Sequence, residues 1–149
     1  LGAKVDTPNK IGVTPVYIAA QQGHVEVLRV LHELGAKVDT PDKDGYTPVY
    51  NAAQQGHVEV LRVLHELGAK VDTPDKDGYT PVYNAAQQGH VEVLRVLHEL
   101  GAKVDTPDKD GYTPVYDAAM QGHVEAVRVL HELGAKVDTP SNGATPVYI

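Results

Sequence analysis

The stretch DKDGYTPVYNAAQQGHVEVLRVLHELGAKVDTP occupies residues 42–74, and it recurs letter for letter at residues 75–107. The flanking blocks, 9–41 and 108–140, each depart from it at four positions. The departures are Asn9, Ile11, Val13 and Ile18 in the first block and Asp117, Met120, Ala126 and Val127 in the last. A period of 33 residues that is repeated four times predicts a stack of similar small modules rather than one closed globule.

These four blocks are numbered repeat 1 to repeat 4 in chain order. The remaining residues, 1–8 and 141–149, match the end of one further repeat and the beginning of another. We therefore expect a single repeat domain over residues 1–149, with four full repeats and two partial ones.

Each repeat carries the signals of two short helices. In repeat 2, Thr47-Pro48 is a helix start, because threonine caps a first turn and proline lacks only an N–H that has no partner there. The pattern predicts a first helix over residues 48–55 and a second helix over residues 58–67. Gly68 suits the left-handed position that commonly follows a helix.

The second helix has a broad apolar face. Its members are Val58, Val60, Leu61, Val63, Leu64 and Leu67. Two helices this short cannot bury so wide a face alone, so each repeat needs a neighbour on both sides and the fold is predicted to be an all-α solenoid. On the same helix, Arg62 is expected to reach Glu59 and Glu66, with each pair contributing only a few tenths of a kcal/mol.

Three motifs in each repeat resemble the ankyrin repeat. In repeat 2 they are Asp-x-x-Gly-x-Thr-Pro at 42–48, Ala-Ala-x-x-Gly-His at 52–57 and Leu-Gly-Ala at 67–69. The resemblance covers essentially the whole chain. It implies stacked helix-turn-helix repeats with short β-hairpin loops that project at right angles. It also implies non-enzymatic binding of other proteins through the hairpin tips and the inner face of the first helices.

Two positions depart from the family pattern. Where the family usually has a histidine that ties loops together by hydrogen bonds, this chain has Tyr17, Tyr50, Tyr83, Tyr116 and Tyr148. That network depends on whether the tyrosine hydroxyl replaces the histidine. The next position is usually large and apolar, but here it is Ile18, Asn51, Asn84, Asp117 and Ile149. The polar members could form a buried ladder or line the binding groove, and we expect partial exposure in the groove.

The candidate binding residues combine two sets. The exposed loop and first-helix positions match those that ankyrin proteins, and designed ankyrin repeat proteins in particular, vary to choose their targets, and the column Asn51, Asn84 and Asp117 is added as part of the groove. They are Lys43, Asp44, Tyr46, Asn51, Gln54, Gln55, Lys76, Asp77, Tyr79, Asn84, Gln87, Gln88, Lys109, Asp110, Tyr112, Asp117, Met120 and Gln121. Because stacked helices lie about 8–10 Å apart, the three hairpin tyrosines should form a ladder along one face. The alternative is that a consensus sequence placed these side chains there without any target.

Composition disfavours several classes of partner. The chain has 13 Lys and Arg against 20 Asp and Glu, a net charge of −7, and no basic block, so we expect no nucleic-acid partner. No stretch of 18 apolar residues is present, so we expect no membrane partner. No targeting signal is seen, and with no cysteine the expected location is cytoplasmic, or the protein is recombinant.

Metal and catalytic sites find little support, and we expect no cofactor. The eight histidines include none in a His-Glu-x-x-His motif, and His57 and His65 would lie about 12 Å apart along a helix. The segment from Thr73 to Gly78 echoes a calcium loop, but Thr73 and Asn84 stand where carboxylates are needed. A repeated surface also lacks the unlike residues that an active site brings together, so the chain is expected not to be an enzyme.

The sequence thus predicts a protein-binding or scaffold module with an unidentified protein partner. The competing interpretation is an engineered, consensus-type repeat array with no dedicated ligand, because two repeats are identical. In either case, uncapped apolar ends could allow end-to-end self-association.

Overall fold

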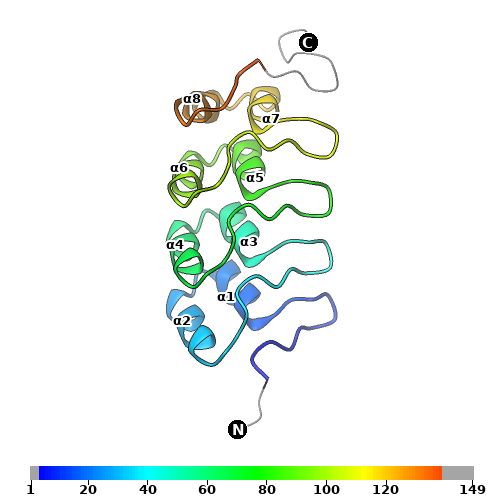
Figure 1. Cartoon of the computed structure of the whole chain (residues 1–149), viewed down its shortest axis with the longest axis vertical. Coiled ribbons are helices and arrows are strands. Elements are labelled where there is room, and N and C mark those ends of the chain that lie inside the picture. The colour runs from blue at the N-terminus through cyan, green and yellow to red at the C-terminus, as the bar shows by residue number, and fades with distance from the viewer. Residues whose placement is uncertain (1–3, 139–149) are drawn as a thin grey trace.

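The computed structural model describes residues 4–138, which form four helix pairs stacked in one direction (Figure 1). The first helices of the pairs are α1 (Pro15–Gln22), α3 (Pro48–Gln55), α5 (Pro81–Gln88) and α7 (Pro114–Met120). The second helices are α2 (Val25–Glu33), α4 (Val58–Glu66), α6 (Val91–Glu99) and α8 (Val124–Glu132). First helices pack on first helices and second on second, each against the adjacent repeat. The predicted all-α solenoid and its short helices are confirmed.

The helix ends follow the sequence signals. The Thr47 Oγ1 accepts a hydrogen bond of 3.1 Å from the backbone N–H of Tyr50, which caps α3. The same cap begins α1, α5 and α7. Gly68 has a φ of 100°, so it adopts the left-handed conformation expected after α4. The second helix ends one residue earlier than predicted, because Leu67 is already the capping residue.

The apolar face of the second helix is buried by the neighbouring repeat. Leu61 and Leu64 of α4 are fully buried, as are the equivalent leucines of α6. Ala52 and Ala53 of α3 are also fully buried, and their small side chains allow the first helices to approach closely. The core is therefore a continuous strip along the stack rather than a central cluster.

The loops between repeats contain turns where β-hairpins were expected. In the loop before α3, the backbone N–H of Asp42 donates to the carbonyl of Tyr46 at 2.9 Å, and that of Gly45 donates to the carbonyl of Asp42 at 3.1 Å. Residues 4–138 contain no strand. One such pair of bonds closes a tight turn, but it is too little pairing to form a ladder. These loops project from the side of the first helices (Figure 1).

Candidate functional site

The predicted binding residues of the loops are accessible. The tip residues Lys43 and Asp44 are exposed, and Tyr46 behind them is half-buried. The equivalents in repeats 3 and 4 are exposed at both tip residues, except that Asp77 is half-buried, and all the loop tyrosines are half-buried. These are Lys76, Asp77, Tyr79, Lys109, Asp110 and Tyr112. Each loop thus presents an ion-pairing tip followed by one aromatic ring.

Each loop tyrosine is held by the tyrosine of the helix that follows. The rings of Tyr46 and Tyr50 are stacked, with their centroids 4.9 Å apart, and those of Tyr79 and Tyr83 are 4.8 Å apart. Burial raises the pKa of Tyr46, and the nearby Asp75 and Asp44 carboxylates raise it further. Its hydroxyl is therefore protonated at neutral pH and available as a hydrogen-bond donor.

The ends of the first helices add polar and flexible side chains. Gln54 and Gln55 are exposed at the end of α3, and Gln88 is exposed at the end of α5, where Gln87 is half-buried. In repeat 4 the corresponding residues Met120 and Gln121 are exposed as well, with Met120 at 60%. These side chains offer amide hydrogen bonds and, in repeat 4, a polarizable apolar contact.

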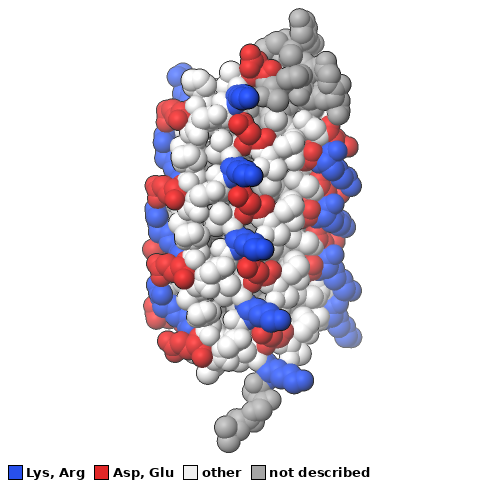
Figure 2. Space-filling model, viewed as in Figure 1, with Lys and Arg blue, Asp and Glu red and all other residues white. Residues whose placement is uncertain are grey.

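Charges on the loop tips are paired between repeats. The Lys76 Nζ lies 2.9 Å from the Asp44 Oδ1, and the Lys109 Nζ lies 3.0 Å from the Asp77 Oδ1. The hydrogen bond to Asp44 raises the pKa of Lys76, and Asp77 does the same for Lys109. Figure 2 shows basic and acidic side chains alternating in columns along the stack.

The second helices show the same arrangement, which corrects the prediction for Arg62. This guanidinium lies 3.1 Å from the Glu99 carboxylate of the next repeat, rather than pairing with Glu59 or Glu66 of its own helix. Glu66 instead pairs with Arg29 of the preceding repeat at 3.3 Å. Stacking brings equivalent helix faces together, so neighbours in space are a whole repeat apart in sequence.

The prediction that Asn51, Asn84 and Asp117 are partly exposed in the groove is wrong. Their exposed fractions are 5%, 5% and 4%. These side chains lie in the interface between first helices, where the preceding repeat supplies a partner for each asparagine. They are therefore removed from the candidate binding surface.

The partner is the tyrosine hydroxyl that stands in the place of the family histidine. The Tyr17 hydroxyl donates to the Asp42 Oδ2 at 3.0 Å and accepts from the Asn51 Nδ2 at 2.9 Å. The Asn84 Nδ2 donates to the Tyr50 hydroxyl at 3.4 Å. We call these contacts and their equivalents at Tyr83 the hydroxyl network. It joins a first helix to both the loop and the first helix of the next repeat.

Asp42 also shapes its own loop. Its Oδ1 accepts hydrogen bonds from the backbone N–H groups of Asp44 at 2.9 Å and Tyr46 at 3.0 Å. Asp75 and Asp108 make the same pair of bonds in the later loops. Asp42 therefore both accepts the hydrogen bond from the Tyr17 hydroxyl and fixes the loop that carries Tyr46.

Histidine makes a second inter-repeat link that sequence reasoning did not locate. The Nε2 atoms of His57, His90 and His123 lie 3.0, 3.2 and 2.9 Å from the carbonyl oxygens of Gln21, Gln54 and Gln87. Because a carbonyl only accepts, each ring donates its Nε2–H. The exact 33-residue recurrence of Gly-His was the available signal, and it marks a structural contact.

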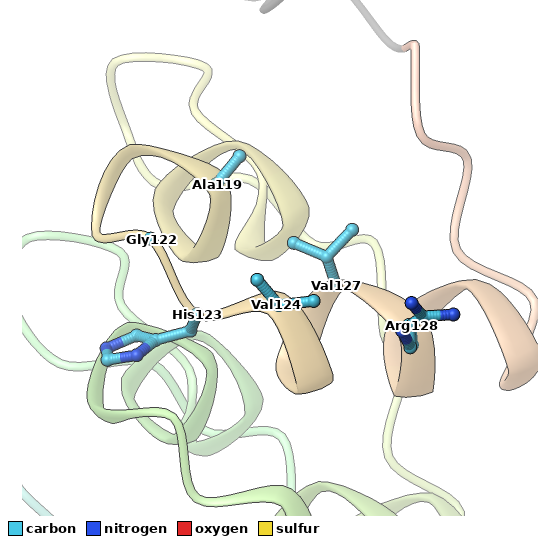
Figure 3. A pocket seen from close by; sticks show the side chains of 6 residues that line it. All are labelled: Ala119, Gly122, His123, Val124, Val127 and Arg128. Atoms are coloured by element: carbon cyan, nitrogen blue, oxygen red, sulfur yellow. The ribbon is translucent and has the colours of Figure 1, made fainter.

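The last described repeat ends in an apolar hollow of about 280 Å³ (Figure 3). Val124 and Val127 line it with Ala119, while the ring of His123 points away, toward repeat 3. Ala119 is exposed, whereas the equivalent Ala53 and Ala86 are fully buried under the next repeat. The hollow thus occupies the place where a further repeat packs.

Within residues 4–138, no three His, Asp or Glu side chains are grouped so that they could hold a metal ion. In the same part of the chain, no helix has the length and apolar character needed to cross a membrane.

The fold defines the class: a repeat protein of stacked helix pairs whose exposed surface recurs with each repeat. A family model described as ankyrin repeats (3 copies) matches residues 1–75 and 68–141. The chain therefore belongs to the ankyrin repeat family. Ankyrin repeats are generally protein-interaction modules, and the family is typically a non-enzymatic binding scaffold. Among curated proteins, no sequence matches the chain.

Proposed function

We propose that this chain binds another protein through the exposed residues of its loops and first helices. The proposed binding ladder consists of Lys43, Asp44, Tyr46, Gln54, Gln55, Lys76, Asp77, Tyr79, Gln87, Gln88, Lys109, Asp110, Tyr112, Met120 and Gln121. The observation that supports it is the recurrence, in three successive repeats, of an accessible tyrosine supported from behind by a second ring.

Tyrosine suits this role because it offers a large apolar area and one hydroxyl at low entropic cost. The paired lysines and aspartates of the tips leave little local net charge, so contact area and hydrogen bonds supply most of the affinity. The net charge of −7 disfavours a phosphate backbone as the partner. We therefore propose a protein partner and neither a nucleic acid nor a membrane.

Affinity capture from a lysate tests this proposal. The first variant carries Tyr46→Ala, Tyr79→Ala and Tyr112→Ala. A second variant, Gln55→Arg with Gln88→Arg, alters exposed side chains without touching the ring stacks. The matched control changes three equally repeated and exposed residues of the second helices, namely Glu59→Ala, Glu92→Ala and Glu125→Ala.

We expect a captured protein to be retained by the control and lost by both ladder variants, with the helical circular dichroism unchanged in the glutamine variant. A partner that both ladder variants still bind would contradict the proposed surface. Failure to capture any protein would favour the alternative, an engineered consensus-type array without a dedicated ligand, which the identity of repeats 2 and 3 also favours.

A second candidate function is end-to-end self-association. Val27 and Val30 of repeat 1 are 48% and 49% exposed, whereas the equivalent Val60 and Val63 of repeat 2 are 1% and 2% exposed. The exposed pair could pack on the apolar hollow of repeat 4 in a second copy. Sedimentation at rising concentration should then show a growing mass that Val27→Glu abolishes, and a constant monomer mass would refute it.

A further inference from the structure

At the first two interfaces, between repeats 1 and 2 and between repeats 2 and 3, an asparagine of the later repeat donates a hydrogen bond to a tyrosine hydroxyl of the earlier repeat. At the first interface, the Tyr17 hydroxyl gives its single proton to Asp42 and takes one from the Asn51 amide. At the second, the Asn84 amide again donates to the Tyr50 hydroxyl. In both, the Oδ1 of the asparagine has no partner, so each amide is held through its N–H alone.

The third interface differs in one residue. Asp117 occupies the position of Asn51 and Asn84, and it is equally buried, at 4% exposed. The Tyr83 hydroxyl gives its proton to the Asp108 Oδ2 at 3.3 Å. An ionised carboxylate can only accept, so it cannot supply the donor that asparagine supplies. Its Oδ2 is buried and has no partner.

The pKa of Asp117 is shifted by its burial and by groups of the preceding loop, of α5 and of the residue before α8. Burial raises the pKa of Asp117, and the Asp108 carboxylate of the loop raises it further. A hydrogen bond from the Gln87 side chain of α5 and the charge of His123, which precedes α8, lower the pKa of Asp117. On the facing side, burial raises the pKa of Tyr83, and the charge of Asp117 is the next cause.

We propose that Asp117 and Tyr83 form a buried proton-binding site, at which protonation of Asp117 restores the missing donor and tightens the docking of repeat 4 onto repeat 3. With the proton bound, the Asp117 carboxyl donates to the Tyr83 hydroxyl as the asparagines do elsewhere. Without it, two carboxylates face one phenol that has a single proton to give. Because the stability of a stack is approximately a sum over repeats and interfaces, a weaker third interface lets repeat 4 open more often while the other repeats stay folded.

The sign of the pH dependence follows from the direction of the shift. Since the pKa of Asp117 is raised in the folded state above its ordinary value of 3.8, the folded state binds the proton more tightly than the unfolded state. The stabilising effect is complete below pH 3.8 and is lost as the pH rises through the folded pKa. Repeat 4 therefore opens more readily at neutral pH than in weak acid, relative to a chain with asparagine at this position.

Native-state hydrogen exchange of the α8 amides, measured between about pH 4 and about pH 8, tests this proposal on the full chain. The matched variant is Asp117→Asn, which reproduces the other two interfaces and leaves His123 and Asp108 in place. Comparing the two proteins at each pH removes the intrinsic pH dependence of exchange. We expect the ratio of the α8 exchange rates, unmodified protein over Asp117→Asn, to exceed one at neutral pH. The ratio should fall toward one as the pH falls.

The reverse substitution moves the site. Asn84→Asp should give the second interface the same pH dependence, visible as faster exchange of α6 near neutral pH and recovery in acid. A ratio between the unmodified protein and Asp117→Asn that stays constant over the whole pH range would overturn the proposal. An unchanged α6 in Asn84→Asp at neutral pH would overturn it as well.

Discussion

Replacing Tyr17 by phenylalanine removes one hydroxyl from an interface without changing its apolar packing. The hydroxyl accepts from the Asn51 Nδ2 at 2.9 Å and donates to the Asp42 Oδ2 at 3.0 Å. Asp42 is half-buried, so water can replace its lost donor. Asn51 is 5% exposed, and its N–H group is left without an acceptor. Such a buried, unpaired donor costs about 1–3 kcal/mol.

For a chain of this size, we expect the melting temperature to fall by about 2–4 °C per kcal/mol. Thermal unfolding followed by circular dichroism measures this shift. The control is Tyr46→Phe, since the Tyr46 side chain is only half-buried, and its effect should stay within about 0.5 kcal/mol.

A second substitution separates the lost hydrogen bond from a general effect of the mutation. Repeat 1 naturally carries Ile18 where repeat 2 carries Asn51. In the Tyr17→Phe background, Asn51→Ile should therefore cost less than in the unmodified protein, because both polar partners are then absent. If Tyr17→Phe is as stable as Tyr46→Phe, or if the two substitutions are simply additive, the hydroxyl network does not hold the repeats together.

Three further outcomes follow from the same structure. Gly45→Ala should destabilise the protein by at least about 1 kcal/mol more than Gly68→Ala in urea unfolding. Both glycines have positive φ, but only at Gly45 would an added Cβ lie 2.9 Å from a backbone atom, the Lys76 nitrogen. Burial, together with the hydrogen bond to Asp42, raises the pKa of Tyr17 to about 12. The stability that this shift provides is present below pH 10 and should be lost between pH 10 and 12. The free energy of unfolding of Tyr17→Phe should therefore fall less over that interval than that of the unmodified protein. Arg62→Gln should lower the free energy of unfolding by less than about 1 kcal/mol, because both groups of the Arg62–Glu99 pair are about half exposed. The loss should be smaller still at high salt, and a larger loss would show that solvent does not screen this pair.

The helices could be predicted from the sequence because their ends are set locally. Thr47-Pro48 fixes the start of α3, and Gly68 marks the point just after the end of α4. Both signals act within a few residues. The stacking of the repeats could also be predicted, since the apolar face of residues 58–67 can be buried only against a neighbouring repeat. The accessible loop tyrosines belong to this predictable part.

The inter-repeat contacts could not be predicted in the same way. A sequence with identical repeats does not show which side chain of one repeat faces which side chain of the next. The spacing along one helix favours Glu59 and Glu66 as partners of Arg62, whereas in the structure the Glu99 carboxylate of the next repeat lies 3.1 Å away. A groove position for Asn51 is what the sequence favours, because its partner, the Tyr17 hydroxyl, lies 34 residues earlier in the chain and no local pattern links the two. The sequence also cannot give the number of backbone hydrogen bonds that each loop closes, and the bonds present form a turn rather than the paired strands of a β-hairpin.

The central claim is that each repeat is stabilised by the repeat before it. Helices α2 and α4 have the same sequence, yet Val27 is 48% exposed and the equivalent Val60 is 1% exposed. Within residues 4–138, a helix pair precedes α4 but none precedes α2, so the free energies of unfolding of Val27→Ala and Val60→Ala compare one substitution without and with that helix pair. Removing two buried carbons should cost about 1.6 kcal/mol or more at Val60 and less than half of that at Val27. Equal losses at the two positions would contradict the account.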